Sequence, residues 1–134
     1  MNQISKEVAE SEFQRFVDGM DLLVDEETMT KDDQKGFRDA KSRIVREIMR
    51  GRATVNDVGE ITFTPSRSGE RDTITFYEPS GDVLRCTDKR GKDEDVGKMY
   101  TAIGRLTRTD AKTIETLKGS DLRFCMAVFA LFFG

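Results

Sequence analysis

Apolar residues recur with helical spacing through the first third of the chain. From Phe13 they follow at offsets of 3, 4, 7 and 11 residues, which places them on one stripe of a helix over residues 6–24. A second stripe predicts another helix between Thr30 and Gly51, and its members are Phe37, Ala40, Ile44, Val45 and Ile48. Ser5 and Thr30 are the expected N-caps. Because a short polar stretch joins the two helices, we expect an antiparallel helical hairpin over residues 1–52.

The spacing changes to two residues after this hairpin. Apolar and polar residues alternate at 60–64 and 73–77, so each segment should be a strand with one apolar face. A turn signal at 56–59 separates the first of these segments from a shorter one at 53–55. The pattern predicts a three-stranded antiparallel meander or a hairpin with a short partner strand. Since so small a sheet is unstable alone in water, its apolar face must lie on helices.

Helical spacing then returns. Three elements are expected before the C-terminal helix: a short helix over 82–87 capped by Ser80, a helix over 96–106, and a short helix from Thr109 or Asp110 to Gly119. A charged loop at 88–95 separates the first two, and Ser120 should cap the last helix, over 121–133. The predicted fold is α+β and predominantly helical. It consists of an N-terminal helical hairpin (1–52), then a small antiparallel β-meander with C-terminal helices (53–134), forming one compact domain.

Composition narrows the chemistry that the chain can perform. Its 134 residues include no histidine and carry a net charge of −3. Histidine is the commonest general base and metal ligand, so most hydrolase and zinc chemistry is disfavoured. The two cysteines, Cys86 and Cys125, lie outside any CxxC pair, and we interpret them as small buried hydrophobes in a reducing compartment.

The short motifs that resemble binding sites fail on their spacing. A calcium loop starting at Asp88 would place Arg90 and Lys92 at ligand positions, where they repel a cation. Gly91 and Gly97 are too far apart for a phosphate-binding GxxxxGK loop. Carboxylate pairs lie in exposed polar stretches. We therefore expect no enzyme activity, no cofactor and no metal.

Charge is distributed unevenly along the chain. Residues 1–34 carry a local net charge of −7, residues 35–52 carry +5, and the remainder carries −1. Two solvated helix faces that attract each other would explain this pattern, and so would head-to-tail pairing of subunits. A nucleic-acid patch is a third interpretation, although Phe37 is the only aromatic residue within the basic segment 35–52.

The C-terminal helix is apolar on nearly every side. Four of the nine phenylalanines lie in the last eleven positions. Burying them would contribute about 6–12 kcal/mol, because each ring contributes roughly 1.5–3 kcal/mol. Two interpretations remain open, namely burial in the chain's own core and burial shared with another polypeptide. On the second, we expect a protein-interaction surface made of Phe124, Val128, Phe129, Leu131, Phe132 and Phe133. The apolar run at 125–133 is too short for a membrane helix, which needs roughly 20 residues.

The order of these elements resembles a known family. The glycine-terminated helix leads into a GRATVNDVG segment at 51–59, and the strand at 74–77 is followed by Glu78-Pro79-Ser80-Gly81-Asp82-Val83-Leu84. A late helix ends in Leu106-Thr107, and the last helix carries paired apolar residues. Over residues 44–133 the chain resembles the tail assembly chaperones of long-tailed, lambda-like bacteriophages.

The resemblance implies a non-enzymatic function. Proteins of this family self-associate, coat the tape measure protein and recruit the tail tube protein in the host cytoplasm, and they are absent from the mature virion. A frameshifted longer form of the same chain is a further implied partner, whereas nucleic acid and membrane are not expected. The alternative is a small regulatory or nucleic-acid-binding adaptor that uses the basic segment 35–52.

Overall fold

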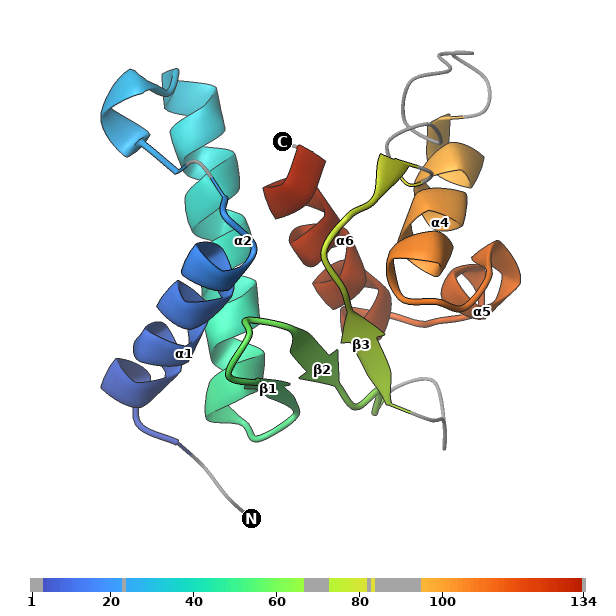
Figure 1. Cartoon of the computed structure of the whole chain (residues 1–134), viewed down its shortest axis with the longest axis horizontal. Helices are drawn as coiled ribbons and strands as arrows, with labels where there is room; N and C mark the ends of the chain where they lie inside the picture. Colours follow the sequence, from blue (N-terminus) through green and yellow to red (C-terminus); the bar gives the residue numbers. More distant parts are fainter. Residues whose placement is uncertain (1–3, 23, 67–72, 82, 84–94, 134) are drawn as a thin grey trace.

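The computed structural model of the chain describes residues 4–22, 24–66, 73–81, 83 and 95–133 (Figure 1). Within these ranges the protein has five α-helices and one small sheet, which confirms the predicted α+β, predominantly helical class. The helices are α1 (Lys6–Gly19), α2 (Lys31–Met49), α4 (Asp95–Leu106), α5 (Ala111–Glu115) and α6 (Ser120–Phe133). The strands are β1 (Ala53–Val55), β2 (Ile61–Phe63) and β3 (Ile74–Phe76).

The two N-terminal helices begin at the predicted caps. The Ser5 hydroxyl accepts a hydrogen bond from the Val8 N–H at 3.3 Å, and the Thr30 hydroxyl accepts one from the Asp33 N–H at 3.1 Å. α2 ends at Met49, and Gly51 follows its C-cap Arg50 with a left-handed φ of 79°, as predicted for a C-terminal glycine. The connection predicted to be only polar includes a short 3₁₀ helix, η1 (Glu26–Thr28).

α1 is shorter than its apolar stripe predicts, and the prediction that it extends to Val24 is wrong. Asp21 takes a left-handed φ of 53°, and the Leu22 N–H donates to the Val17 carbonyl at 3.0 Å, so the chain reverses there. A contact between the end of α1 and the β1–β2 turn explains why the helix ends early. α1 runs against the β1–β2 turn, where a Cβ added to Gly19 would meet the Val58 carbonyl and come within 2.7 Å of the Gly59 Cα.

The three strands form the predicted meander. Their order is β1-β2-β3 and both pairings are antiparallel, with Val55 opposite Ile61 and Phe63 opposite Ile74. Gly59, with a φ of 94°, closes the predicted turn between β1 and β2. Alternate side chains of β2 and β3 are buried on one face, namely Ile61, Phe63, Ile74 and Phe76. On the other face the Thr62 and Thr75 hydroxyls lie 3.0 Å apart.

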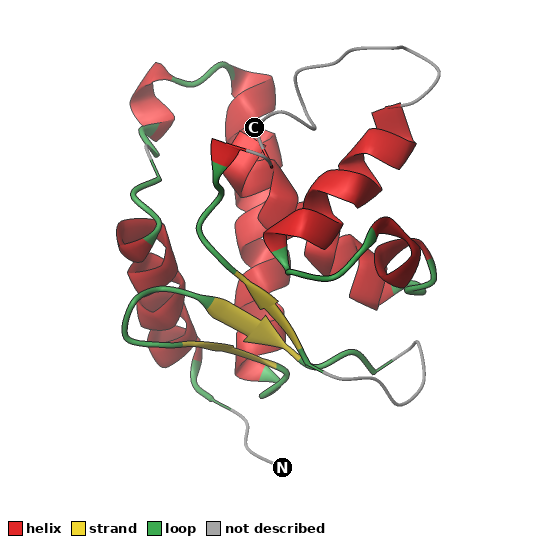
Figure 2. Ribbon diagram, turned by 45° about the vertical axis from the view of Figure 1, so that its right-hand side comes forward, coloured by secondary structure: helices red, strands yellow, loops and turns green. Residues whose placement is uncertain are grey.

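Helix α6 occupies the middle of the molecule. It lies between α2 and α4 (Figure 1), and Figure 2 shows the sheet crossing in front of α2. One cluster of buried apolar side chains includes residues from the N-terminal helices, the sheet, α4, α5 and α6. For example, Phe16 of α1 contacts Phe132 of α6 edge to face, with ring centroids 5.6 Å apart.

The remaining predicted elements have mixed outcomes. α4 forms as predicted, and Asp110 rather than Thr109 caps α5. α5 ends at Glu115 and not at Gly119, which instead takes a left-handed φ of 54° before α6. Ser120 is the first residue of α6 itself. Of the predicted helix over 82–87 only Val83 is described, and it is buried, while the loop at 88–94 lies outside the described residues.

Candidate functional site

The structure divides the six residues that were predicted to form an interaction surface. Phe124 and Val128 are fully buried within the chain itself. The Phe124 ring stacks on Phe63 at 4.2 Å with an interplanar angle of 12°, and it meets Phe76 edge to face at 6.1 Å. The apolar face of the sheet therefore takes up these two side chains. Their assignment to a contact surface is corrected, because they belong to the core.

The other predicted residues lie nearer the surface. Phe129, Leu131 and Phe132 are only partly buried and pack against the edge of the core. The side chain of Phe133 lies outside the described residues. Three of the six predicted side chains thus remain partly accessible, at the C-terminal end of α6.

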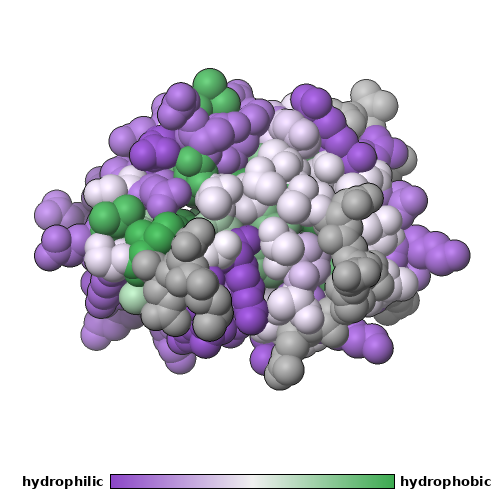
Figure 3. Space-filling model, turned by 90° about the horizontal axis from the view of Figure 1, so that it is seen from below, coloured by the Kyte–Doolittle hydropathy of each residue, from purple (hydrophilic) through white to green (hydrophobic). Residues whose placement is uncertain are grey.

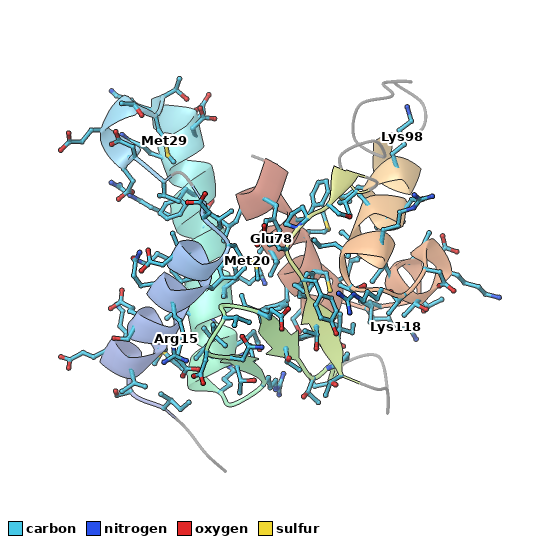
Figure 4. The ribbon with its side chains drawn as sticks, viewed as in Figure 1. Arg15, Met20, Met29, Glu78, Lys98 and Lys118 are labelled. Carbon is cyan, nitrogen blue, oxygen red and sulfur yellow. The ribbon has the colours of Figure 1, made fainter. Side chains whose placement is uncertain are left out.

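Two hollows lie side by side between α2 and α6. The first has a volume of about 410 Å³ and combines apolar and acidic side chains, and it is lined by Val24, Met29, Asp32, Asp33, Gly36, Phe37, Ala40, Ala130 and Leu131. Figure 4 shows Met29 where the η1 connection reaches the start of α2. The predicted contact residue Leu131 lines this hollow, so part of the predicted surface does open to solvent.

The second hollow continues from the first toward the other end of α2. Its volume is about 580 Å³, and it is lined by Asp39, Ala40, Ser42, Arg43, Arg46, Arg123, Met126 and Ala127. Ala40 lines both hollows, and we call the pair together the α2–α6 groove. Met126 is 38% exposed, which makes it the one large apolar side chain of α6 counted as exposed among the described residues.

The charges in the α2–α6 groove have no partners within the described structure. The ion pairs among the described residues join Arg38 to Glu26 at 2.9 Å, Lys41 to Glu10 at 3.8 Å and Arg50 to Glu47 at 3.2 Å. None of them involves the groove's three arginines, which are Arg43, Arg46 and Arg123. Nor do they involve Asp32 and Asp33, which are exposed in the first turn of α2 and interact favourably with the positive end of the helix dipole.

Sequence reasoning found only half of this groove. The basic segment 35–52 was recognised, but Arg123 is 77 residues away from Arg46 in the chain. The sequence of α6 does carry a signal for the missed half of the groove. One helical face has no aromatic residue, and it consists of Arg123, Met126, Ala127 and Ala130. This row marks the outer side of a helix that otherwise is apolar all round.

Hydrophobic side chains also reach the surface outside the groove. Seen from below in Figure 3, the molecule shows many hydrophilic side chains and a few small groups of hydrophobic ones. Val8 is 50% exposed and Val58 is 63% exposed, but they lie on α1 and on the β1–β2 turn rather than in the groove. In Figure 4 Arg15 projects from α1 toward β1, where its guanidinium donates to the Val55 carbonyl at 2.9 Å.

Two of the described chemistry-bearing side chains, Cys125 and Asp25, have structural surroundings. Burial raises the pKa of the Cys125 thiol to about 12, and the negative charge of Asp121 adds to the shift, so the thiol is neutral and enclosed. Asp25 accepts from the Glu27 N–H at 3.1 Å as a helix cap. Across the described residues, no three Cys, Asp or Glu side chains are grouped so as to hold a metal ion. Cys86 lies outside those residues.

None of the helices in the described ranges combines the length and the apolar character that a bilayer span requires. Comparisons of the chain with known protein families, with curated proteins and with solved structures found no match.

Proposed function

We propose that this protein is a non-enzymatic tail assembly chaperone of a long-tailed bacteriophage, which self-associates and coats the tape measure protein. In this role it acts in the host cytoplasm, recruits the tail tube protein and leaves before the virion is complete. A longer, frameshifted form of the chain would take part in the same assembly. The resemblance over residues 44–133 supports this proposal.

The observation that supports the proposal is the α2–α6 groove. In this groove apolar side chains such as Leu131 and Met29 lie beside charged ones, and the groove is open to solvent. A coat that must later come off requires moderate apolar area and charge pairing that water can compete with, rather than a deep pocket. An amphipathic helix of the tape measure protein is the kind of ligand that such a groove accommodates.

The gene and its neighbours provide the first test. We expect a second reading frame that overlaps the 3′ end, reached through a run of U at the Phe132 and Phe133 codons, and then one very long helical reading frame. Codons UUC-UUC without an overlapping frame would contradict the frameshifted partner. The absence of a long helical reading frame would contradict the chaperone role.

Co-expression with the protein of that long reading frame provides the second test. We expect the parent chain to keep it in the soluble fraction, and Leu131→Asp to lose this effect because a charge enters the apolar hollow. Val58→Asp is the matched control, since Val58 is exposed but distant from the groove. Circular dichroism verifies that each variant is folded, and Met29→Asp replaces Leu131→Asp if the latter unfolds. Equal activity of the parent and both groove variants would contradict the proposal.

The arginines favour one second candidate, a nucleic-acid-binding adaptor that uses the basic segment 35–52. Arg43 and Arg46 are unpaired within the described structure, and Arg123 extends the same basic surface. Such binding would weaken steeply with salt. Fluorescence anisotropy with a labelled duplex at low and high salt tests it, and the absence of binding at low salt would exclude it.

A further inference from the structure

One side of helix α2 lines both halves of the α2–α6 groove. The residues on this side follow one another at alternating intervals of four and three positions, and they are Asp32, Gly36, Asp39, Arg43 and Arg46. Since a helix turns by about 100° per residue, these five positions lie within about 80° of one another around the α2 axis. A ligand that lies in the groove therefore contacts them in this order.

The charges on this side of α2 are sorted along the groove. Asp32 and Asp39 come first, and Arg43 and Arg46 follow, over about 20 Å in total because a helix rises about 1.5 Å per residue. α6 runs in the opposite direction (Figure 1), so its Arg123 lies at the same end as Arg46 and lines the same hollow. The groove thus has an acidic half followed by a basic half.

These charges are available to a ligand. Asp32, Asp39, Arg46 and Arg123 are exposed, and Arg43 is half-buried. The ion pairs found among the described residues use other side chains. Two neighbouring blocks of unpaired charge attract a ligand whose own charges have the complementary order.

The middle of the groove admits a third helix at close range. Small residues line it on both sides, at Gly36 and Ala40 of α2 and at Ala127 and Ala130 of α6. A Cβ added to Gly36 would have nothing within 4 Å, so the space beside it is open. Small side chains at a contact allow helix axes to approach closely. Met126, which is 38% exposed, lines the groove beside this centre and offers a flexible apolar contact.

We propose that the α2–α6 groove binds one amphipathic helix of another polypeptide, in which acidic side chains at one end and basic side chains at the other flank an apolar centre. The acidic end of this helix lies over the arginines of the basic half, and its basic end lies over Asp32 and Asp39. About 14 residues, or four turns, span the charged stretch. That the helix belongs to the tape measure protein rests on the proposed function, whereas its order of charges follows from the groove alone.

A ligand of one charge sign fits the groove less well. An acidic peptide or a nucleic acid would pair with the arginines, but Asp32 and Asp39 on the same side of α2 would repel it. None of the described residues that line the basic half is an aromatic residue on which a base would stack. A basic peptide would pair with the aspartates and be repelled by the arginines. A ligand whose charges are separated end to end pairs with both halves.

Three fluorescent peptides with the same apolar centre test the order of charges by fluorescence anisotropy. Each has about 18 residues and blocked ends, so that a helix can form in water. The mixed peptide carries Glu at its N-terminal end and Lys at its C-terminal end, and the two uniform peptides carry only Glu or only Lys at both ends. We expect the parent chain to bind the mixed peptide about tenfold or more tightly than either uniform peptide. The dissociation constant of the mixed peptide should rise with salt.

Changing the charges of one half should change which peptide binds best. Arg46→Glu with Arg123→Glu reverses two charges of the basic half, so this double variant should prefer the Lys peptide. Asp32→Lys with Asp39→Lys reverses the acidic half, so this double variant should prefer the Glu peptide. Each peptide is compared between the parent and the variants, so differences in the helix content of the free peptides do not affect the result. Circular dichroism verifies that each variant is folded, and the arginine double variant alone decides if the aspartate double variant unfolds.

Two control variants carry the same charge changes at exposed positions outside the groove, Lys6→Glu with Lys112→Glu and Asp57→Lys with Glu115→Lys. Both should keep the parent's preference for the mixed peptide. The proposal is overturned if the parent binds none of the peptides, or if it binds the Glu peptide or a labelled DNA duplex most tightly. Groove variants that keep the parent's preference would overturn it as well.

Further outcomes separate this ligand from the proposed function. If the peptides bind in the expected order but the tape measure protein is not kept soluble, the chaperone role fails and the ligand of the groove stands. If the parent and the arginine double variant keep the tape measure protein equally soluble and show the same peptide preference, the order of charges fails and the chaperone role stands. If sedimentation equilibrium shows a dimer that the arginine double variant loses, and the mixed peptide does not bind, a second copy fills the groove and the proposal fails.

Discussion

The stacked rings of Phe124 and Phe63 allow the contribution of α6 to the core to be measured. Phe124 is fully buried, and its ring lies 4.2 Å from Phe63 and 6.1 Å from Phe76. Replacing a buried phenylalanine with alanine typically costs about 3–5 kcal/mol, and each aromatic pair contributes about 0.5–1.5 kcal/mol beyond area burial. We therefore expect Phe124→Ala to lower the free energy of unfolding by about 4 kcal/mol.

Urea unfolding followed by far-UV circular dichroism, at a protein concentration low enough to avoid association, measures this change. Met126→Ala is the matched control, because it removes an exposed side chain two positions further along the same helix. That change should alter the free energy of unfolding by less than about 0.5 kcal/mol. Phe124→Leu should fall between the two. If Phe124→Ala and Met126→Ala unfold at the same urea concentration and with the same slope, the ring does not lie in the core and the reasoning is refuted.

Three further predictions concern single positions. Gly19→Ala should reduce the free energy of unfolding by about 1–3 kcal/mol and so lower the melting temperature, because the added methyl group overpacks against the β1–β2 turn. Gly36→Ala lies in open space and should raise the melting temperature. Equal shifts of the two variants would contradict the close contact at Gly19. Because the pKa of Cys125 is raised to about 12, its contribution to stability is complete below the unfolded pKa and is lost as pH rises through about 9 to 12. Cys125→Ala should therefore lose less stability than the parent between neutral and alkaline pH in thermal melts. The Thr113 N–H, and then the Thr113 hydroxyl, lower the pKa of Asp110, so its contribution is present above the ordinary carboxyl pKa and is lost as pH falls through the lowered value. Asp110→Asn should show a shallower loss in acid, and parallel pH profiles would contradict that cause.

Local signals predicted the parts of the fold that depend on neighbouring residues. The second helix is fixed by its stripe, its Thr30 cap and Gly51, and the meander by alternation and a turn that ends in glycine. The end of α1 was missed because it depends on a contact with a distant segment. The apolar stripe continues to Val24, but Gly19 meets the β1–β2 turn and Asp21 reverses the chain.

The candidate site was only partly predictable for the same reason. A helix that is apolar all round is either central to a core or covered by a partner, and its sequence does not choose between them. The structure places the sheet against Phe124 and leaves Leu131 at a surface hollow, a division that follows from how α6 lies over β2 and β3. Arg123 joins Arg43 and Arg46 only because α6 lies antiparallel to α2.

The position of α6 in chain order has a consequence for biosynthesis. The helix that covers Phe63 and Phe76 is made after every strand, and the Ser66 N–H reaches its Asp121 carboxylate across 55 residues at 3.0 Å. While the ribosome is still translating the segment between them, the rings of Phe63 and Phe76 lack the cover that α6 provides. Nascent chains that stall before codon 120 would therefore expose sticky aromatic surface and become substrates for host folding factors or proteases.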